Sequence, residues 1–482
     1  GGATLVDPPH PPRPPPAGRP MEAGIKGFWK NYPAITALLA DLGASAAVGP
    51  YTTSAFWAPR GAGQPAELIN QAPVFSSKPR LPTPLGQMVW TADAFTTLTL
   101  ADRLSVLGIV AAMVDVQSSP EALDRYNRMT ARELFTKIGV TRAVYRDFLA
   151  PTLQVALFAP PEQLAASDVL LCLDFYALAH QDSFDVAWCT GSVSEKIFGP
   201  LVSRIKAAGG EVCGGRVVTR VEVDPATGAA ARVVHTAAGS SSPSSDEEAD
   251  AVDAVVFAVG IKGMQAIVRG SPDLAKLDEF RNVAALKTID CVSARLWFDR
   301  PVPTRFPANV LAGFDGEEIG GTFFNLNALQ DEYNPRAGPT VEGCIACDWY
   351  GASTLLPLSD DTIVARARAN LEACEPGFKH RTMVDSCVAR AVGAVTAFSP
   401  GSLAHRPTQA TSIDNVWISG DWVKGVDTKA DGLSQERAYV TGLTAAGLVV
   451  DKLGVGSAPV IPQIVDDEPH VAAAKRAARA AA

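Results

Sequence analysis

Four apolar runs, each ending in glycine or aspartate, constrain the fold of this chain more than any other feature. They occupy residues 3–7, 211–224, 251–260 and 415–420. Runs of this kind are typical of strands buried on both faces of a mostly parallel sheet. Because they lie far apart in the chain, we expect one discontinuous lobe that a second lobe interrupts.

A chain of 482 residues is too long for a single core, so at least two lobes are expected. We predict an α/β fold with a Rossmann-like nucleotide-binding lobe and a mixed α+β substrate lobe. The nucleotide-binding lobe would comprise residues 1–27, 194–266 and 405–456. The substrate lobe would comprise residues 28–193 and 267–404, followed by a tail at 457–482.

Helices are expected where apolar periodicity meets capping residues. We predict an amphipathic helix at 25–43, ended by Gly43, and a largely helical stretch at 101–190. We also predict a helix at 194–210, ended by a glycine pair, a helix at 359–374 that begins at Ser359, and a frayed terminal helix at 472–482.

Composition excludes several classes of protein. The net charge is −9 and the sequence has no basic run, which argues against a nucleic-acid partner. The single Cys-x-x-Cys, Cys344 to Cys347, is interpreted as incidental thiols of a buried strand, and no metal site is predicted. No apolar run reaches membrane-spanning length. The nearest, residues 104–114, would be a buried helix or a monotopic membrane contact.

The segment 415–454 carries the clearest chemical signal. Gly420 lets the backbone approach a ligand closely, which leaves the amide of Asp421 free for a polar group and its carboxylate free for a hydroxyl. Gly432, Ser434 and Glu436 open a helix, and Ala438 begins a face of small residues. The free N–H groups at such a helix start suit the N1–C2=O edge of a flavin. The alternative is an ordinary helix that packs tightly on a sheet.

Asp7 ends the first apolar run, where dinucleotide folds place the acid that binds the adenosine ribose. A G-x-G-x-x-G turn is expected roughly twenty residues before that acid, whereas only Gly1 and Gly2 stand near the start of this sequence. We therefore expect a processed or incomplete chain, or one that has lost the turn.

The stretch "NVWISGDW…GLSQERAYVTGLTAA" resembles the C-terminal FAD motif of the flavin-dependent amine oxidase superfamily, in its carotenoid (phytoene and zeta-carotene) desaturase-like branch. The resemblance implies FAD as the cofactor. It also implies cofactor contacts at Gly18 and Arg19, from a worn Gly-Gly-Arg segment, and at Gly24, from a Glu-x-Gly segment. The backbone of Val218 would hold the adenine, and Gly260 would end the strand that closes the lobe. Prolines replace the usual Arg-x-Gly-Gly-Arg loop.

The resemblance further implies an oxidoreductase that moves hydride from a long apolar isoprenoid-type substrate to FAD and on to a quinone-like acceptor. No catalytic side chain is assigned, because the flavin performs the chemistry, and His180 is interpreted as a buried or capping residue. Peripheral contact with a plastid membrane is expected from the family alone. The alternative is a catalytically inactive flavin-fold protein that serves as a structural or assembly subunit of a larger complex.

Overall fold

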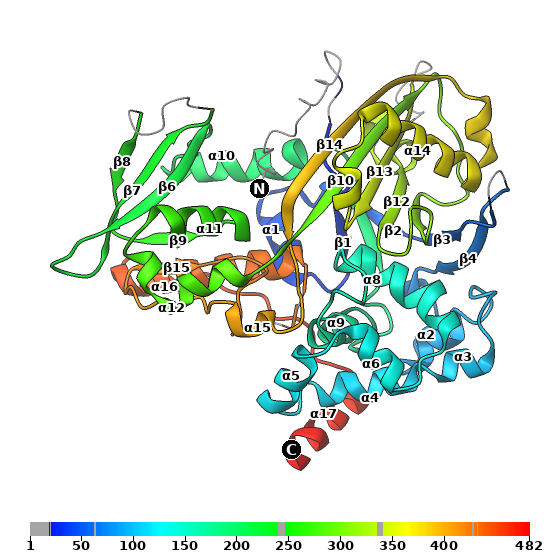
Figure 1. Cartoon of the computed structure of the whole chain (residues 1–482), viewed down its shortest axis with the longest axis horizontal. Coiled ribbons are helices and arrows are strands. Elements are labelled where there is room, and N and C mark those ends of the chain that lie inside the picture. Colours follow the sequence, from blue (N-terminus) through cyan, green and yellow to red (C-terminus); the bar gives the residue numbers. More distant parts are fainter. Residues whose placement is uncertain are drawn as a thin grey trace.

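The computed structural model describes residues 19, 21–61, 64–239, 246–334, 341–426, 429–430 and 432–482. The predicted strand at 3–7, with Asp7, and the predicted site residue Gly18 lie outside the described residues. Figure 1 shows a large sheet and its helix at one end of the molecule, a smaller group of strands and helices at the other, and a helical region below the large sheet.

The large sheet has seven strands in the order β14-β10-β13-β12-β11-β3-β4, antiparallel except where β11 meets β3. Its strands are β3 (Ser54–Ala58), β4 (Glu67–Ala72), β10 (Thr288–Phe298), β11 (Ala308–Leu311), β12 (Gly320–Asn325), β13 (Gly343–Tyr350) and β14 (Met383–Thr396). Helix α14 (Asp360–Cys374) covers one face, and Ser359 caps it as predicted by accepting a hydrogen bond from the Thr362 amide. The mixed α/β class predicted from the sequence is confirmed.

The Cys-x-x-Cys lies within β13, where both thiols are buried. Cys344 packs with Trp297 on one face of the sheet, and Cys347 packs with Trp349 on the other. Burial raises the pKa of Cys344 to about 12. The thiols therefore cannot act as a pair, and the interpretation as incidental thiols of a buried strand is confirmed.

The helical region follows the predicted pattern at 101–190, with one exception at its end. It contains α2 (Leu85–Trp90), α3 (Leu100–Leu104), α4 (Leu107–Asp115), α5 (Pro120–Asn127), α6 (Ala131–Lys137), α7 (Arg142–Val144), α8 (Ala150–Ala156) and α9 (Ala166–Leu173). The exception is β5 (Val186–Cys189), a fully buried strand that pairs with β1 (Gly27–Trp29) and β2 (Val48–Thr52).

The predicted helix at 25–43 is shorter than expected. Residues 27–29 pair with β5 as strand β1, so the helix, α1 (Pro33–Asp41), begins only at Pro33. Proline suits the first helical turn because it has no N–H to leave unbonded. Gly43, at a φ of 66°, follows the helix as predicted.

The smaller group of elements is built on two parallel strands, β9 (Val255–Phe257) and β15 (Val416–Ile418). An antiparallel sheet of β6 (Arg216–Val223), β7 (Ala230–Ala237) and β8 (Glu248–Ala251) lies beside them (Figure 1). The helices are α10 (Gly199–Ala207), α11 (Ile261–Gly270), α12 (Asp278–Arg281), α15 (Ser402–His405) and α16 (Gln435–Leu453).

Two expectations for this region are wrong. The run 211–224 was expected to be buried in a mostly parallel sheet, but only residues 216–223 form a strand, and that strand pairs antiparallel with β7. The reason is that β6 is only half-buried along most of its length, as suits a hairpin with one wet face. The run 251–260 holds only the three-residue strand β9.

The tail is a packed helix rather than a frayed one. Helix α17 (Pro469–Ala481) buries Val471 and Lys475, and the Lys475 ammonium donates to Asp174 at 2.6 Å and to Asp467 at 3.1 Å. The alanine-rich sequence does not reveal this contact, because the helix is held by a buried ion pair between Lys475 and Asp174, which lies far away in the chain.

Candidate functional site

The carboxyl ends of β9 and β15 meet at one edge, because the two strands are parallel and paired from Val255–Val416 to Phe257–Ile418. Gly260 and Gly420 follow these ends. Gly420 has a φ of 147°, and a Cβ there would lie 2.8 Å from Nε1 of Trp422. The indole N–H of Trp422 donates to the carbonyl of Val259 at 3.1 Å, which links the ends of β9 and β15. The same ring leaves no space for a side chain at position 420.

Asp421 is held by the neighbouring elements. Its Oδ1 accepts a hydrogen bond from Oγ1 of Thr396 at 3.0 Å. Burial raises the pKa of the Asp421 carboxyl, and the Thr396 hydroxyl and the guanidinium groups of Arg437 and Arg406 partly oppose the rise. Arg437 also donates to the backbone carbonyls of Asp421 and Val423, at 3.0 and 2.6 Å. One carboxylate oxygen is thus already bonded within the protein.

Helix α16 begins beside this loop. The Ser434 hydroxyl caps it by accepting from the Arg437 amide at 3.1 Å. Glu436 is fully buried, and its carboxylate accepts from the amides of Ala34 and Ile35 at 2.7 and 2.9 Å. Glu436 therefore caps α1 in this structure. Burial raises the pKa of the Glu436 carboxyl, and the two amides oppose that rise.

The edge of β9 and β15 is open at two positions. A Cβ added at Gly260 would meet nothing within 4 Å, and Ala438, on the first turns of α16, is exposed. Gly432, at a φ of 80°, packs against Leu157. The open glycine, the small exposed residue and the helix N-terminus together fit a flavin. Val218 lies in β6, half-buried and paired with His235.

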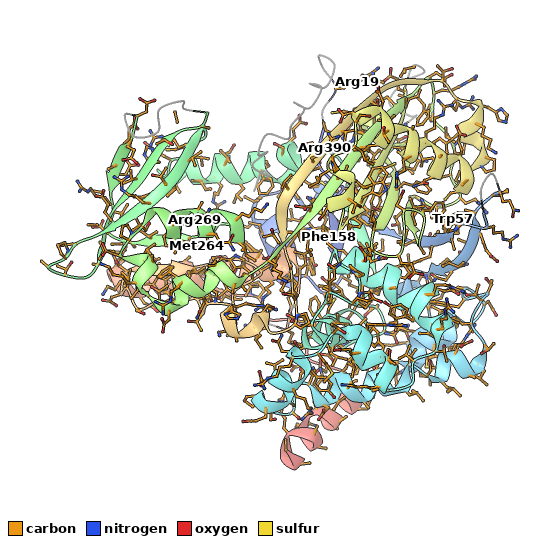
Figure 2. The ribbon with its side chains drawn as sticks, in the orientation of Figure 1. Arg19, Trp57, Phe158, Met264, Arg269 and Arg390 are labelled. Carbon is orange, nitrogen blue, oxygen red and sulfur yellow. The ribbon has the colours of Figure 1, made fainter. Side chains whose placement is uncertain are left out.

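Arg19 and Gly24 contact the large sheet instead. The Arg19 guanidinium lies over the Trp297 ring and donates to Glu342 and Asp385, at 2.5 and 2.6 Å. Figure 2 shows Arg19 at the upper end of the large sheet, and Met264 and Arg269 on α11 in the other group of elements. The structure therefore does not bring Arg19 together with Gly420.

Gly24, at a φ of 69°, lies over a buried acid. A Cβ at Gly24 would stand 3.6 Å from Oδ1 of Asp348, on β13. Oδ1 of Asp348 accepts from the Ser293 hydroxyl at 2.5 Å, while its Oδ2 has no hydrogen-bond partner among the described residues. Burial raises the pKa of Asp348, against the smaller opposing influence of Ser293, Lys26 and Arg295.

An apolar cavity of about 210 Å³ lies in the helical region. Its wall comes from α2, α4, α8, α9 and the edge of the large sheet, and includes Phe56, Met88, Val110, Met113, Leu153, Cys172 and Tyr176. The Cβ atom of Cys172 would lie 3.8 Å from a Cβ at Gly432. One end of the cavity therefore reaches the loop that opens α16.

Sequence reasoning identified the wall only in part. Aromatic residues at 28–32, 183–189 and 321–327 could equally have been cavity or core. Of these, Phe184 lines the cavity, whereas Trp29 and Phe324 pack in the core. Tyr176 was missed, because one tyrosine in a helical pattern gives no sign of the face it occupies. His180 does not line the cavity, and its ring nitrogens are buried.

Residues 12–450 match the family of flavin containing amine oxidoreductases. A 15-cis-phytoene desaturase of Synechococcus elongatus is 22% identical over 71% of this chain and 70% of its own. The tomato (Solanum lycopersicum) enzyme described as 15-cis-phytoene desaturase, chloroplastic/chromoplastic, is 21% identical over 84% of this chain and 65% of its own. A probable zeta-carotene desaturase of Synechococcus elongatus is 21% identical over 91% and 90%.

Solved structures share the fold. Cyclohexylamine oxidase from Brevibacterium oxydans gives a TM-score of 0.60 at 13% identity, over 90% of this chain and 88% of its own. A putrescine oxidase variant gives 0.60 at 14% identity, over 90% and 89%.

The chain belongs to the flavin containing amine oxidoreductase family, because the match spans most of its length. Within that family it is carotenoid desaturase-like. FAD is its cofactor and its class is an FAD-dependent oxidoreductase, as predicted from the C-terminal motif.

Proposed function

We propose that the protein oxidises a long apolar isoprenoid-type substrate and passes the electrons to a quinone-like acceptor. The observation that carries the proposal is the apolar cavity, whose wall at Cys172 lies beside the loop before α16. An apolar wall of this kind favours a hydrocarbon chain, and its described residues include no carboxylate that could pair with a cationic amine.

The cofactor contacts in this proposal follow the geometry of the β9–β15 edge. Gly260, Gly420 and Asp421 would face the flavin from the strand ends. Gly432 would do so from the loop before α16, Ser434 from the cap of that helix and Ala438 from its first turns. Val218 would contact the adenine through its backbone. When bound, the flavin supplies the hydride acceptor. The protein holds the substrate in the cavity and excludes water from it.

The test begins with the purified protein. We expect it to show the visible absorbance of oxidised flavin, to bleach under anaerobic conditions on addition of a linear carotene, and to regain its colour on addition of a benzoquinone. A colourless protein that takes up no added FAD would contradict the proposal and favour the structural-subunit alternative. Bleaching by a primary amine but not by a carotene would contradict the substrate class.

We also propose that the cavity opens towards a membrane surface. Leu85 and Val89 on α2 and Leu100, Leu104 and Leu107 on α3 and α4 are exposed by 38% or more, beside helices that form the cavity wall. In the described part of the chain, no helix is both long and apolar enough to cross a bilayer. The proposed attachment is therefore peripheral, and a plastid membrane is the proposed location, supported by the names of the plant relatives.

A further inference from the structure

Tyr176 belongs both to the cavity wall and to a buried chain of hydroxyl groups. Its hydroxyl lies 2.6 Å from the hydroxyl of Tyr32, which follows β1. The Ser434 side chain, the cap of α16, lies close enough to lower the pKa of both tyrosines against the larger effect of burial. The paired tyrosine hydroxyls therefore lie near both the cavity wall and the helix end at which the cofactor is proposed to lie.

A chain of hydroxyls can be oriented in two directions, because each group both donates and accepts a hydrogen bond. In the first direction Tyr176 donates to Tyr32, and its proton points away from the cavity. In the second, Tyr32 donates to Tyr176, whose own proton is then available to a molecule in the cavity. Either atom of the Tyr32–Tyr176 pair is placed to be the donor.

Most other donors on the wall are already in use. Gln87 donates to the carbonyl of Ala177, Asn70 to that of Asp147, and Thr91 to that of Gln87. Arg103 donates to two carbonyls, those of Ala92 and Phe95. The Thr152 hydroxyl has no partner among the described residues, which makes it the competing candidate for any donor role.

We propose that Tyr176 is the hydrogen-bond donor with which this cavity recognises a carbonyl oxygen of a quinone-type acceptor. When a hydrocarbon fills the same space, the Tyr176 hydroxyl donates its hydrogen bond to Tyr32 instead. The proposal rests on the proposed function, since it requires that the cavity receive both an apolar substrate and a quinone. Tyr176 is then a specificity-determining residue, and Tyr32 is its positioning residue.

The two orientations let one apolar wall serve two kinds of ligand. A buried hydroxyl without a partner is destabilising, and the reversal keeps Tyr176 bonded in both cases. Burial raises the pKa of Tyr32 and of Tyr176 well above the usual range, and the nearby Glu436 and Cys172 side chains add to the rise at Tyr32. Both tyrosines are therefore neutral hydroxyls near neutral pH.

The experiment compares two ligands of nearly the same shape on the flavin-loaded, oxidised protein. Tetramethyl-1,4-benzoquinone carries two carbonyl oxygens, and 1,2,4,5-tetramethylbenzene carries none. Equilibrium dialysis gives the dissociation constant of each. Tyr176→Phe is expected to weaken quinone binding about tenfold, the loss of one hydrogen bond, and to leave hydrocarbon binding within about twofold.

Tyr32→Phe is expected to have the opposite effect. It removes the Tyr32 hydroxyl, to which Tyr176 donates when a hydrocarbon is bound. Hydrocarbon binding should therefore weaken by about fivefold, while quinone binding stays near that of the wild type. Tyr126→Phe is the matched control, because its hydroxyl bonds Asp115 outside the cavity, and both constants should be unchanged. An unaltered flavin spectrum shows that each variant is folded.

Two results would overturn the proposal. One is that Tyr176→Phe changes the two dissociation constants equally, or changes neither. The other is that Thr152→Val, and not Tyr176→Phe, removes the preference for the quinone. Because binding is measured without turnover, a protein that fails to oxidise any carotene can still show or lack this discrimination. Failure of the proposed function is thus distinguishable from failure of the proposed role of Tyr176.

Discussion

Gly420 shows how a single position limits what this edge of the molecule can accept. Its backbone lies at a φ of 147°, and the Trp422 ring fills the place of a side chain. A larger residue must displace that ring, whose indole N–H bonds the carbonyl of Val259 at the end of β9. The glycine therefore serves both the backbone conformation and the alignment of the two strand ends.

We predict that Gly420→Val lowers the ratio of bound flavin to protein at least tenfold. The visible absorbance of the purified protein measures that ratio. Gly139→Val is the control, since Gly139 also has a positive φ, of 78°, but a Cβ there meets nothing within 4 Å. Full flavin occupancy in Gly420→Val would show that the cofactor does not lie at this edge.

Asp348 gives a prediction about pH. Burial raises its pKa, so the folded protein holds the proton to a higher pH than the unfolded chain does. From about pH 4, the pKa of an unfolded aspartate, the wild type loses stability as the pH rises towards the folded-state value. Asp348→Asn has no proton to lose and can still accept from Ser293.

The difference in thermal midpoint between Asp348→Asn and the wild type should therefore increase in favour of the variant as the pH rises from about 5 to about 8. Ser293→Ala provides the comparison, because it removes the hydrogen bond to Asp348 and leaves the titrating carboxyl group in place. A difference that is constant with pH would show that Asp348 does not keep its proton in the folded state.

At the scale of elements, the sequence predicts the features that a local residue pattern determines. It does not predict the features that depend on contacts between residues far apart in the chain. Helix α14 was predicted to its first residue, because Ser359 and two aspartates mark its start. The start of α1 was misplaced, since residues 27–29 are strand only through their pairing with β5. In the candidate site, the glycine–aspartate end of β15 was identified from its motif. The contacts of Arg19 with Glu342 and Asp385 were not, because their separation in the chain hides them.

Helix α17 is fixed to the helical region by the buried ammonium of Lys475, which is 4% exposed. We predict that Lys475→Met destabilises the protein by about 3 kcal/mol, because it leaves the Asp174 carboxylate buried without its cation. Urea unfolding followed by circular dichroism measures the loss.

Lys452→Met is the control for this substitution. Lys452 is also a helical lysine paired with an aspartate, Asp414, but both side chains are exposed. Its loss should change the free energy of unfolding by less than about 1 kcal/mol. Equal effects of the two substitutions would show that α17 is not anchored through Lys475.

At the scale of the whole molecule, the exposed leucines lie on α3 and α4, two helices that also line the cavity, and the cavity wall at Cys172 lies beside the loop before α16. In Figure 1, α2 and α3 stand at the corner of the molecule away from β9 and β15. A substrate that enters from a bilayer would thus travel along the cavity towards the strand ends.

We predict that changing Leu100, Leu104 and Leu107 together to Asp lowers binding to phospholipid vesicles at least tenfold, since each exposed leucine contributes about 1 kcal/mol or more when it enters the apolar layer. Vesicle flotation measures the bound fraction. Val455, Val460 and Val465, exposed by 60%, 88% and 69%, provide the control when changed to Asp in the same way. Equal losses in the two triple variants would contradict a specific membrane-facing surface.

The bond between Glu436 and the start of α1 joins residues that are 402 positions apart. During synthesis the amides of Ala34 and Ile35 leave the ribosome long before the carboxylate that caps them has been made. The first helix of the described chain therefore cannot take its final place until nearly the whole polypeptide has emerged. A chain that ends before residue 436 would lack the carboxylate that accepts from the amides of Ala34 and Ile35, and the start of α1 would stay without its cap.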